Sequence, residues 1–133
     1  MGEVINVYCK ACKKGWQCFT GNGLQHGRKE MILAAFSGQE RQQAESLLAA
    51  SMIPAYDFRY GLAACGHCHN VVAVPVLRAV DSEDSCVGRC PLCGQKTGNL
   101  CTEEQSVEEW SEKTACPACK SHRLQAETVG DWD

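Results

Sequence analysis

The sequence predicts a small, mainly β protein that is held together by bound metal and carries one inserted α-helix. The chain of 133 residues contains 11 cysteines, while aromatic residues make up only 7% of it. A conventional hydrophobic core would therefore be thin. Most of the cysteines form C-x-x-C pairs, which is the spacing of metal-binding turns. β-Prone segments flank several of these pairs, so the turns are expected at the ends of strands.

Short β-prone runs account for the expected strands. Residues 4–8 lead into the first pair of cysteines, and apolar and polar residues alternate over 16–20 as they would in a half-buried strand. The same alternation in residues 56–62 leads into the second pair. Residues 71–77 are the most β-prone segment of the chain, and residues 86–89 return toward the third pair.

One segment has the period of a helix. Ser37 and Glu40 form an S-x-x-E capping box, and apolar residues then recur on one face up to about residue 52. We expect this helix, over residues 37–52, to pack on the strands as part of the core. Residues 31–36 could extend it or form a strand. For residues 103–112 we favour a loop-like structure over a short helix.

Eight cysteines in four C-x-x-C pairs are the candidate metal ligands. Four thiolates complete a tetrahedral zinc site, so eight are enough for two Zn²⁺ ions. A permissive residue after the second cysteine helps the chain to turn around the metal. The candidate ligands are Cys9, Cys12, Cys65, Cys68, Cys90, Cys93, Cys116 and Cys119.

The remaining metal-binding side chains are predicted not to be ligands. His67 occupies a spacer position inside the second pair, and His69 directly follows that pair. We interpret Cys18, Cys86 and Cys101 as small buried hydrophobes. Cys86, four residues before Cys90, could also replace a ligand in a shifted site.

The pairing of the four turns stays open from the sequence. Sequential pairing, which we favour, places one ribbon in residues 1–85, with the helical insertion near 37–52, and a second ribbon in residues 86–133. Nested pairing joins the second turn to the third and the first to the fourth, and would give a single domain. A cross-braced arrangement needs more convoluted connections.

Hydropathy, cysteine chemistry and charge indicate in which compartment the protein is expected and which class of partner it favours. No apolar run approaches the roughly 20 residues of a membrane span, and reduced thiols are typical of the cytoplasm, where we expect the protein. The formal net charge is −3, and two zinc ions held by eight thiolates would make it more negative. This charge disfavours general nucleic-acid binding and favours a protein partner.

The motifs resemble those of a known class. The four C-x-x-C turns, with Cys-Pro-x-Cys in the last two, resemble tandem rubredoxin-like zinc ribbons. The stretch from Cys9 to Cys12, followed by Gly21-Asn22-Gly23, is similar to that of small uncharacterised bacterial zinc-ribbon proteins. The resemblance implies structural zinc at the eight paired cysteines. It is nearly silent on biochemical role, because zinc ribbons serve many functions.

A closed four-cysteine site leaves no coordination position for water, which argues against a catalytic zinc. We therefore predict a structural zinc protein that acts as a protein-interaction or adaptor module and not as an enzyme. One alternative is a ribbon that binds nucleic acid or takes part in transcription. Another is a rubredoxin-like electron carrier with iron in a four-sulfur site.

Overall fold

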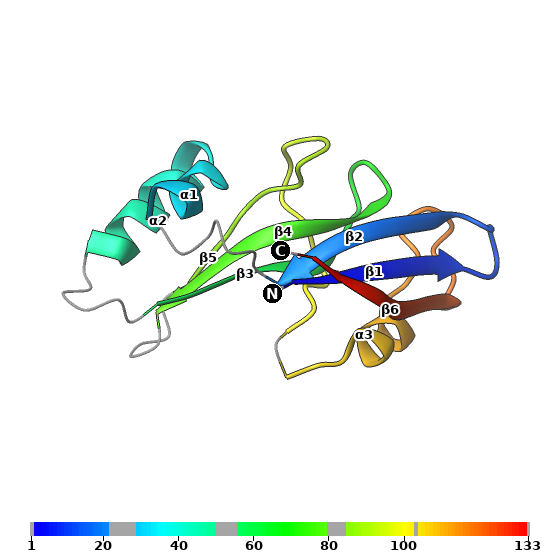
Figure 1. The fold of residues 1–133 in the computed structure, drawn as a ribbon. Coiled ribbons are helices and arrows are strands. Elements are labelled where there is room, and N and C mark those ends of the chain that lie inside the picture. The colour runs from blue at the N-terminus through cyan, green and yellow to red at the C-terminus, as the bar shows by residue number, and fades with distance from the viewer. Residues whose placement is uncertain (1, 22–28, 50–55, 80–84, 103, 133) are drawn as a thin grey trace.

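The computed structural model describes residues 2–21, 29–49, 56–79, 85–102 and 104–132. Six strands within these ranges form one antiparallel sheet in the order β5-β4-β3-β2-β1-β6 (Figure 1). The elements in chain order are β1 (Gly2–Cys9), β2 (Gly15–Gly21), α1 (Lys29–Ala34), α2 (Gly38–Ala49), β3 (Tyr56–Cys65), β4 (Asn70–Ala79), β5 (Ser85–Val87), α3 (Val107–Lys113) and β6 (Leu124–Trp132). The mainly β class expected from the sequence is confirmed.

Two long hairpins form most of the sheet. β1 pairs with β2 from Gly2 to Tyr8, and β3 pairs with β4 over ten residues. The two hairpins join through one residue pair, Gly21 with Tyr60. β6, which the sequence did not suggest, lies along the other side of β1. Strands from both sides of residue 85 therefore share one sheet.

Helices α1 and α2 cover one end of the sheet, away from the turn between β1 and β2 (Figure 1). Their apolar faces pack on β3, β4 and β5 in a cluster that contains Ile32, Phe36, Ala44, Leu48, Phe58, Leu77 and Cys86. The predicted core role of the inserted helix is confirmed, although its expected end at residue 52 lies outside the described residues. Residues 29–34 form helix α1. Most of the segment 31–36, for which the sequence left helix and strand open, is therefore helical.

The loop-like prediction for residues 103–112 was wrong in its second half. α3 begins after Ser106, whose side-chain oxygen accepts a hydrogen bond from the Glu109 N–H at 3.1 Å. Ser106 and Glu109 have the S-x-x-E spacing of a capping box, so the sequence carried the signal. The helix forms because it buries Trp110, which is only 1% exposed.

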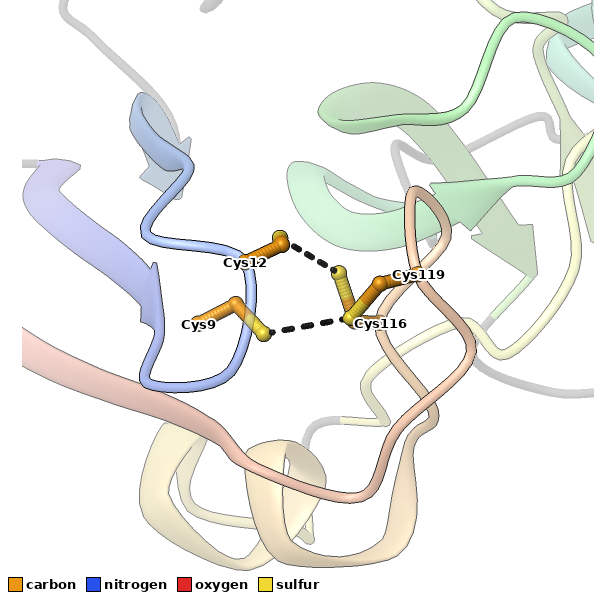
Figure 2. A group of neighbouring side chains, drawn as sticks. All are labelled: Cys9, Cys12, Cys116 and Cys119. Carbon is orange, nitrogen blue, oxygen red and sulfur yellow. Dashed lines mark hydrogen bonds between the residues drawn. The ribbon is translucent and has the colours of Figure 1, made fainter.

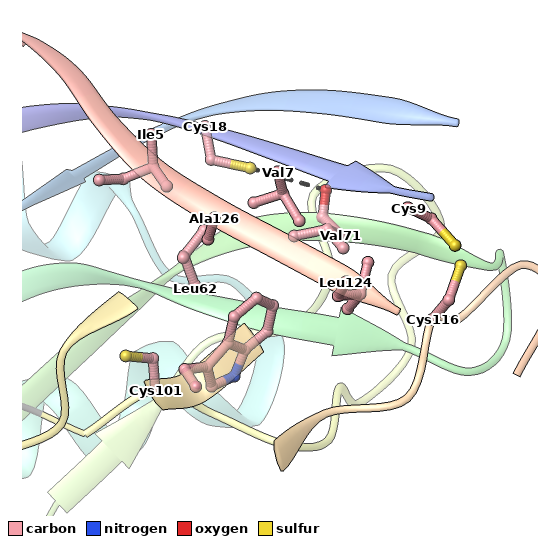
Figure 3. Close-up of a cluster of buried hydrophobic side chains, with 11 residues drawn as sticks. Ile5, Val7, Cys9, Cys18, Leu62, Val71, Cys101, Cys116, Leu124 and Ala126 are labelled. Atoms are coloured by element: carbon pink, nitrogen blue, oxygen red, sulfur yellow. Dashed lines mark hydrogen bonds between the residues drawn. The ribbon is translucent and has the colours of Figure 1, made fainter. Parts of the chain in front are cut away.

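The main core lies between the β6-β1-β2 strands, the β3–β4 hairpin and α3 (Figure 3). It is built from Ile5, Val7, Leu62, Val71, Trp110, Leu124 and Ala126, together with four cysteines. Two of those cysteines, Cys9 and Cys116, belong to predicted metal-binding turns. The predicted metal-binding turns thus continue directly into the hydrophobic core.

Candidate metal centres

The eight predicted ligands lie in two groups of four. Site 1 consists of Cys9, Cys12, Cys116 and Cys119, and site 2 consists of Cys65, Cys68, Cys90 and Cys93. Within each group all sulfur atoms lie within 4.8 Å of one another. Each group could hold one metal ion.

The sulfur separations fit a tetrahedral ion. A zinc–sulfur bond of about 2.3 Å implies sulfur–sulfur edges of about 3.8 Å in a regular tetrahedron. At site 1 the Sγ atoms of Cys9 and Cys119 are 3.6 Å apart, and those of Cys12 and Cys116 are 3.8 Å apart (Figure 2). At site 2 the corresponding distances are 3.6 Å and 3.7 Å. The donor set and its spacing therefore suit a tetrahedral thiophilic cation.

The sequential pairing favoured from the sequence was wrong, because the turns are nested. β6 runs beside β1, which brings the fourth turn to the first, and the Lys10 N–H donates to the Arg123 carbonyl at 3.1 Å. The chain after the third turn returns to β3, where Ala64 and Gly98 exchange two backbone hydrogen bonds of 3.0 Å. Each site thus links cysteines from both sides of the boundary predicted at residues 85/86.

All four turns share one backbone geometry. The residue four positions after the first cysteine donates its N–H to that cysteine's carbonyl, at 2.8 to 3.0 Å. This residue has a left-handed φ in every turn: 67° at Lys13, 62° at His69, 76° at Gly94 and 66° at Lys120. The expected permissive position therefore exists, but glycine fills it once.

Each site contains at least one thiol whose pKa is lowered, and at site 1 the pKa of Cys119 is lowered as well, chiefly by hydrogen bonds from Ser121. At Cys9 burial acts to raise the pKa, but the Cys12 backbone N–H and the Ser121 hydroxyl outweigh it and the pKa falls to about 6. At Cys65 burial is likewise outweighed, chiefly by backbone N–H groups including that of Cys68, and the pKa falls to about 7. The turns thus stabilise the first thiolate at neutral pH.

A second thiol in each site resists ionisation. The Lys14 N–H acts to lower the pKa of Cys12, but burial and the neighbouring thiols raise the pKa to about 11. The Gln95 N–H acts in the same way at Cys93, where burial and the other three thiols raise the pKa to about 12. Crowding of four sulfurs around one point opposes further negative charge. A divalent cation at that point would remove the opposition.

Polar side chains next to the sulfurs orient the ligands. The Ser121 Oγ lies 3.1 Å from the Cys119 Sγ and 3.6 Å from the Cys9 Sγ. At site 2 the Asn70 Nδ2 donates to the Cys68 carbonyl at 3.2 Å and to the Cys68 Sγ at 3.5 Å. Neither residue was predicted from the sequence. Their positions just after C-x-x-C turns, in residue types that donate hydrogen bonds, were the available signal.

Histidine is absent from both groups. His67 and His122 are exposed. The His69 Nδ1 lies 3.0 Å from the Pro117 carbonyl and therefore acts as its donor. This contact joins the second turn, in site 2, to the fourth turn, in site 1.

The three unpaired cysteines lie apart from both groups and are buried. Burial raises the pKa of Cys18 to about 11, and burial also raises the pKa of Cys86 and Cys101. The Cys86 Sγ donates to the Glu40 carbonyl at 3.1 Å. These thiols are neutral packing groups, and Cys86 does not replace a ligand.

Comparison of the chain with protein-family models, curated proteins and solved structures finds no match. None of the helices in the described part of the chain has the length and apolar composition that crossing a membrane requires.

Proposed function

We propose that the protein is a structural zinc protein in which two ions, each bound by four cysteines, hold the sheet together, and that it acts as a protein-interaction or adaptor module. The observation that carries the proposal is the pair of closed four-sulfur groups. In both, the sulfur spacing matches a zinc tetrahedron, and among the residues that the structure describes only cysteines take part.

Each site would serve as a cross-link between distant segments. Site 1 joins residues 9–12 to residues 116–119, and site 2 joins 65–68 to 90–93. Around site 2 the buried apolar cluster contains Ala63, Val72 and Val74 beside Cys65 and Cys90. Such a small cluster stabilises its surroundings weakly by itself, so metal binding would supply a large share of the free energy that holds the segments around site 2 together.

The geometry also supports the resemblance to zinc ribbons. At site 1 one turn closes the β1–β2 hairpin and the other leads into β6, so both lie at the end of a three-stranded β2-β1-β6 sheet. Since metal ligation requires reduced thiols, we place the protein in a reducing compartment, the cytoplasm. A bound ion surrounded by four sulfurs keeps no open position for a substrate, which favours a binding role over catalysis.

Metal analysis of matched variants tests the zinc assignment. We expect two zinc ions per chain by native mass spectrometry and elemental analysis. Cys65→Ser should lose one ion, because three thiolates leave an incomplete tetrahedron. The double variant His67→Ala with His69→Ala should keep both, with a loss of about 1 kcal/mol for the hydrogen bond to Pro117. If the histidine variant loses an ion while Cys65→Ser keeps two, the assignment of all-cysteine sites is refuted. If the purified protein contains mainly iron, the zinc assignment is wrong and the electron-carrier alternative takes its place.

A further inference from the structure

A groove opens between β2 and β4. β2 is joined to the β3–β4 hairpin at its two ends, through the Gly21–Tyr60 pair and through a hydrogen bond of 3.0 Å from the Trp16 Nε1 to the Asn70 Oδ1, and in its middle through the buried Cys18 Sγ, which donates to the Val71 carbonyl at 3.7 Å. Between these contacts lies a cavity of about 630 Å³ that also reaches Leu92 in the third turn and Trp132 in β6. Its volume is in the range of pockets that bind small molecules, roughly 300–1,000 Å³.

The lining suits an apolar group. Phe19 and Leu92 are 50% and 67% exposed at the groove. The indole N–H groups of Trp16 and Trp132 are already used, since the Trp132 Nε1 donates to the Thr20 carbonyl at 2.9 Å. An occupant would therefore gain mainly by burying apolar surface. A nucleobase would leave much of its polar edge without hydrogen-bond partners, which is costly, whereas an aliphatic or aromatic side chain has no such edge.

The end of the groove at Trp16 meets a cluster of positive charge. Trp16 follows the first turn directly, and the first, second and fourth turns contact one another through the Lys10–Arg123 and His69–Pro117 hydrogen bonds. Residues 9–16, 65–70 and 115–123 contain no acidic residue. They carry five exposed cations: Lys10, Lys13, Lys14, Lys120 and Arg123.

These cations exceed what site 1 needs. A divalent ion with four thiolates carries a formal charge of −2, and the second turn belongs to site 2, so the five cations face a formal charge of −4 from the two sites and leave an excess of about one positive charge at this end. The turn of site 2 that holds Cys90 and Cys93 is flanked by Arg89 and Lys96, and Arg89 is already paired with Glu40 at 2.9 Å. At the other end of the groove Glu3 pairs across the sheet with Asp131, next to Trp132. Two acidic residues therefore lie near the Trp132 end, together with Arg59, which lines the same neighbouring pocket as Glu3, and the excess of positive charge is at the Trp16 end.

We propose that the groove binds a linear segment of another protein that inserts a large apolar side chain between β2 and β4 and places acidic residues against the turns of site 1. This inference rests on the proposed function, because it names the binding surface of the adaptor. The class of partner follows from two features of the surface. The apolar lining favours a segment with a large apolar side chain, and the excess positive charge favours acidic residues next to that side chain.

Synthetic peptides added to protein loaded with two metal ions test the proposal. The probe is a peptide of two Asp-Glu repeats, one Gly and the anchor Leu-Phe-Leu. One control replaces the acids with Lys, another replaces the anchor with Ser, and a third is a short oligothymidylate. We expect the probe to shift the NMR indole signals of Trp16 and Trp132 and to bind at least tenfold more tightly than each control. The proposal is wrong if the probe causes no shift up to about 1 mM, if the Lys peptide binds equally well, or if the oligothymidylate binds best.

Matched variants locate the site. Phe19→Ser and Leu92→Ser should each weaken probe binding about tenfold. Val129→Ser should not, because Val129 is similarly exposed (47%) but lies on β6 outside the groove. Lys14→Gln should weaken binding, while Lys113→Gln on α3 should leave it unchanged. If Val129→Ser weakens binding as much as Phe19→Ser and Leu92→Ser, or Lys113→Gln as much as Lys14→Gln, the assigned surface is wrong.

Metal content separates the two proposals. A chain without two zinc ions contradicts the proposed function. If protein that holds two zinc ions does not bind the probe peptide, only the proposal that the groove binds a peptide is contradicted.

Discussion

Asn70→Asp should selectively weaken metal binding at site 2. The Asn70 amide accepts a hydrogen bond from the Trp16 indole and donates to the carbonyl and the Sγ of Cys68. Aspartate has the same shape and keeps the acceptor for Trp16. It replaces the donor, 3.5 Å from the sulfur, with a carboxylate oxygen.

The size of the effect follows from two terms. A hydrogen bond to a charged group contributes roughly 2 kcal/mol, so its loss alone lowers the affinity of site 2 about thirtyfold. Repulsion between the carboxylate and the thiolates adds to this loss, by about 1 kcal/mol at 4 Å in water and more in a partly buried site. Asn70→Ala should show the first term without the repulsion, although it also releases the Trp16 indole.

Chelator competition followed by native mass spectrometry measures this effect, and NMR signals of the turns assign the lost ion to a site. Asn6→Asp is the matched control, because the Asn6 Oδ1 also accepts a side-chain hydrogen bond, from the Gln17 Nε2 at 3.2 Å, and Asn6 lies on β1, in neither metal site. Equal metal affinity in the Asn70→Asp and Asn6→Asp proteins would refute the reasoning. Loss of the ion from site 1 would refute it as well.

Three further outcomes are expected. Lys13→Gly should be about 1 kcal/mol more stable to urea than Lys13→Ala, because both remove the charge but only glycine adopts a φ of 67° without strain; equal midpoints would contradict the turn geometry. Zinc affinity should rise with pH between about 6 and 8, because the ion must displace protons held by Cys12 and Cys93, whose pKa values are raised to about 11 and about 12. A pH-independent zinc affinity in competition assays would argue against thiolate ligation. The lowered pKa values of Cys9 and Cys65, about 6 and about 7, contribute stability to the metal-free fold above the unfolded pKa near 9. This contribution is lost as pH falls through 7 and 6. Chelation at neutral pH should collapse the dispersed amide spectrum, and a metal-free sample that keeps its dispersion would show that the apolar core suffices.

α3 has a local signal in the sequence, whereas β6 has none. α3 begins with the S-x-x-E spacing of Ser106 and Glu109, but the acidic composition of its surroundings favoured a loop. What decides for the helix is burial of Trp110 in the main core, a contact with β-strands that are distant in sequence. β6 has two buried residues, Leu124 and Ala126, followed by exposed ones, so its alternation is too short to mark it as a strand.

The sequence alone determined which eight cysteines gather, because a C-x-x-C turn is a local structure closed by a hydrogen bond between residues four positions apart. It also determined the main hairpins and the inserted helix, whose periods are local properties of the chain. The tertiary structure decided which turns come together. Cys9 meets Cys119 because β6 pairs with β1, and this long-range pairing depends on burial of a common core. The same packing gathers the lysines of both chain ends around site 1, a charge distribution that the net charge of −3 conceals.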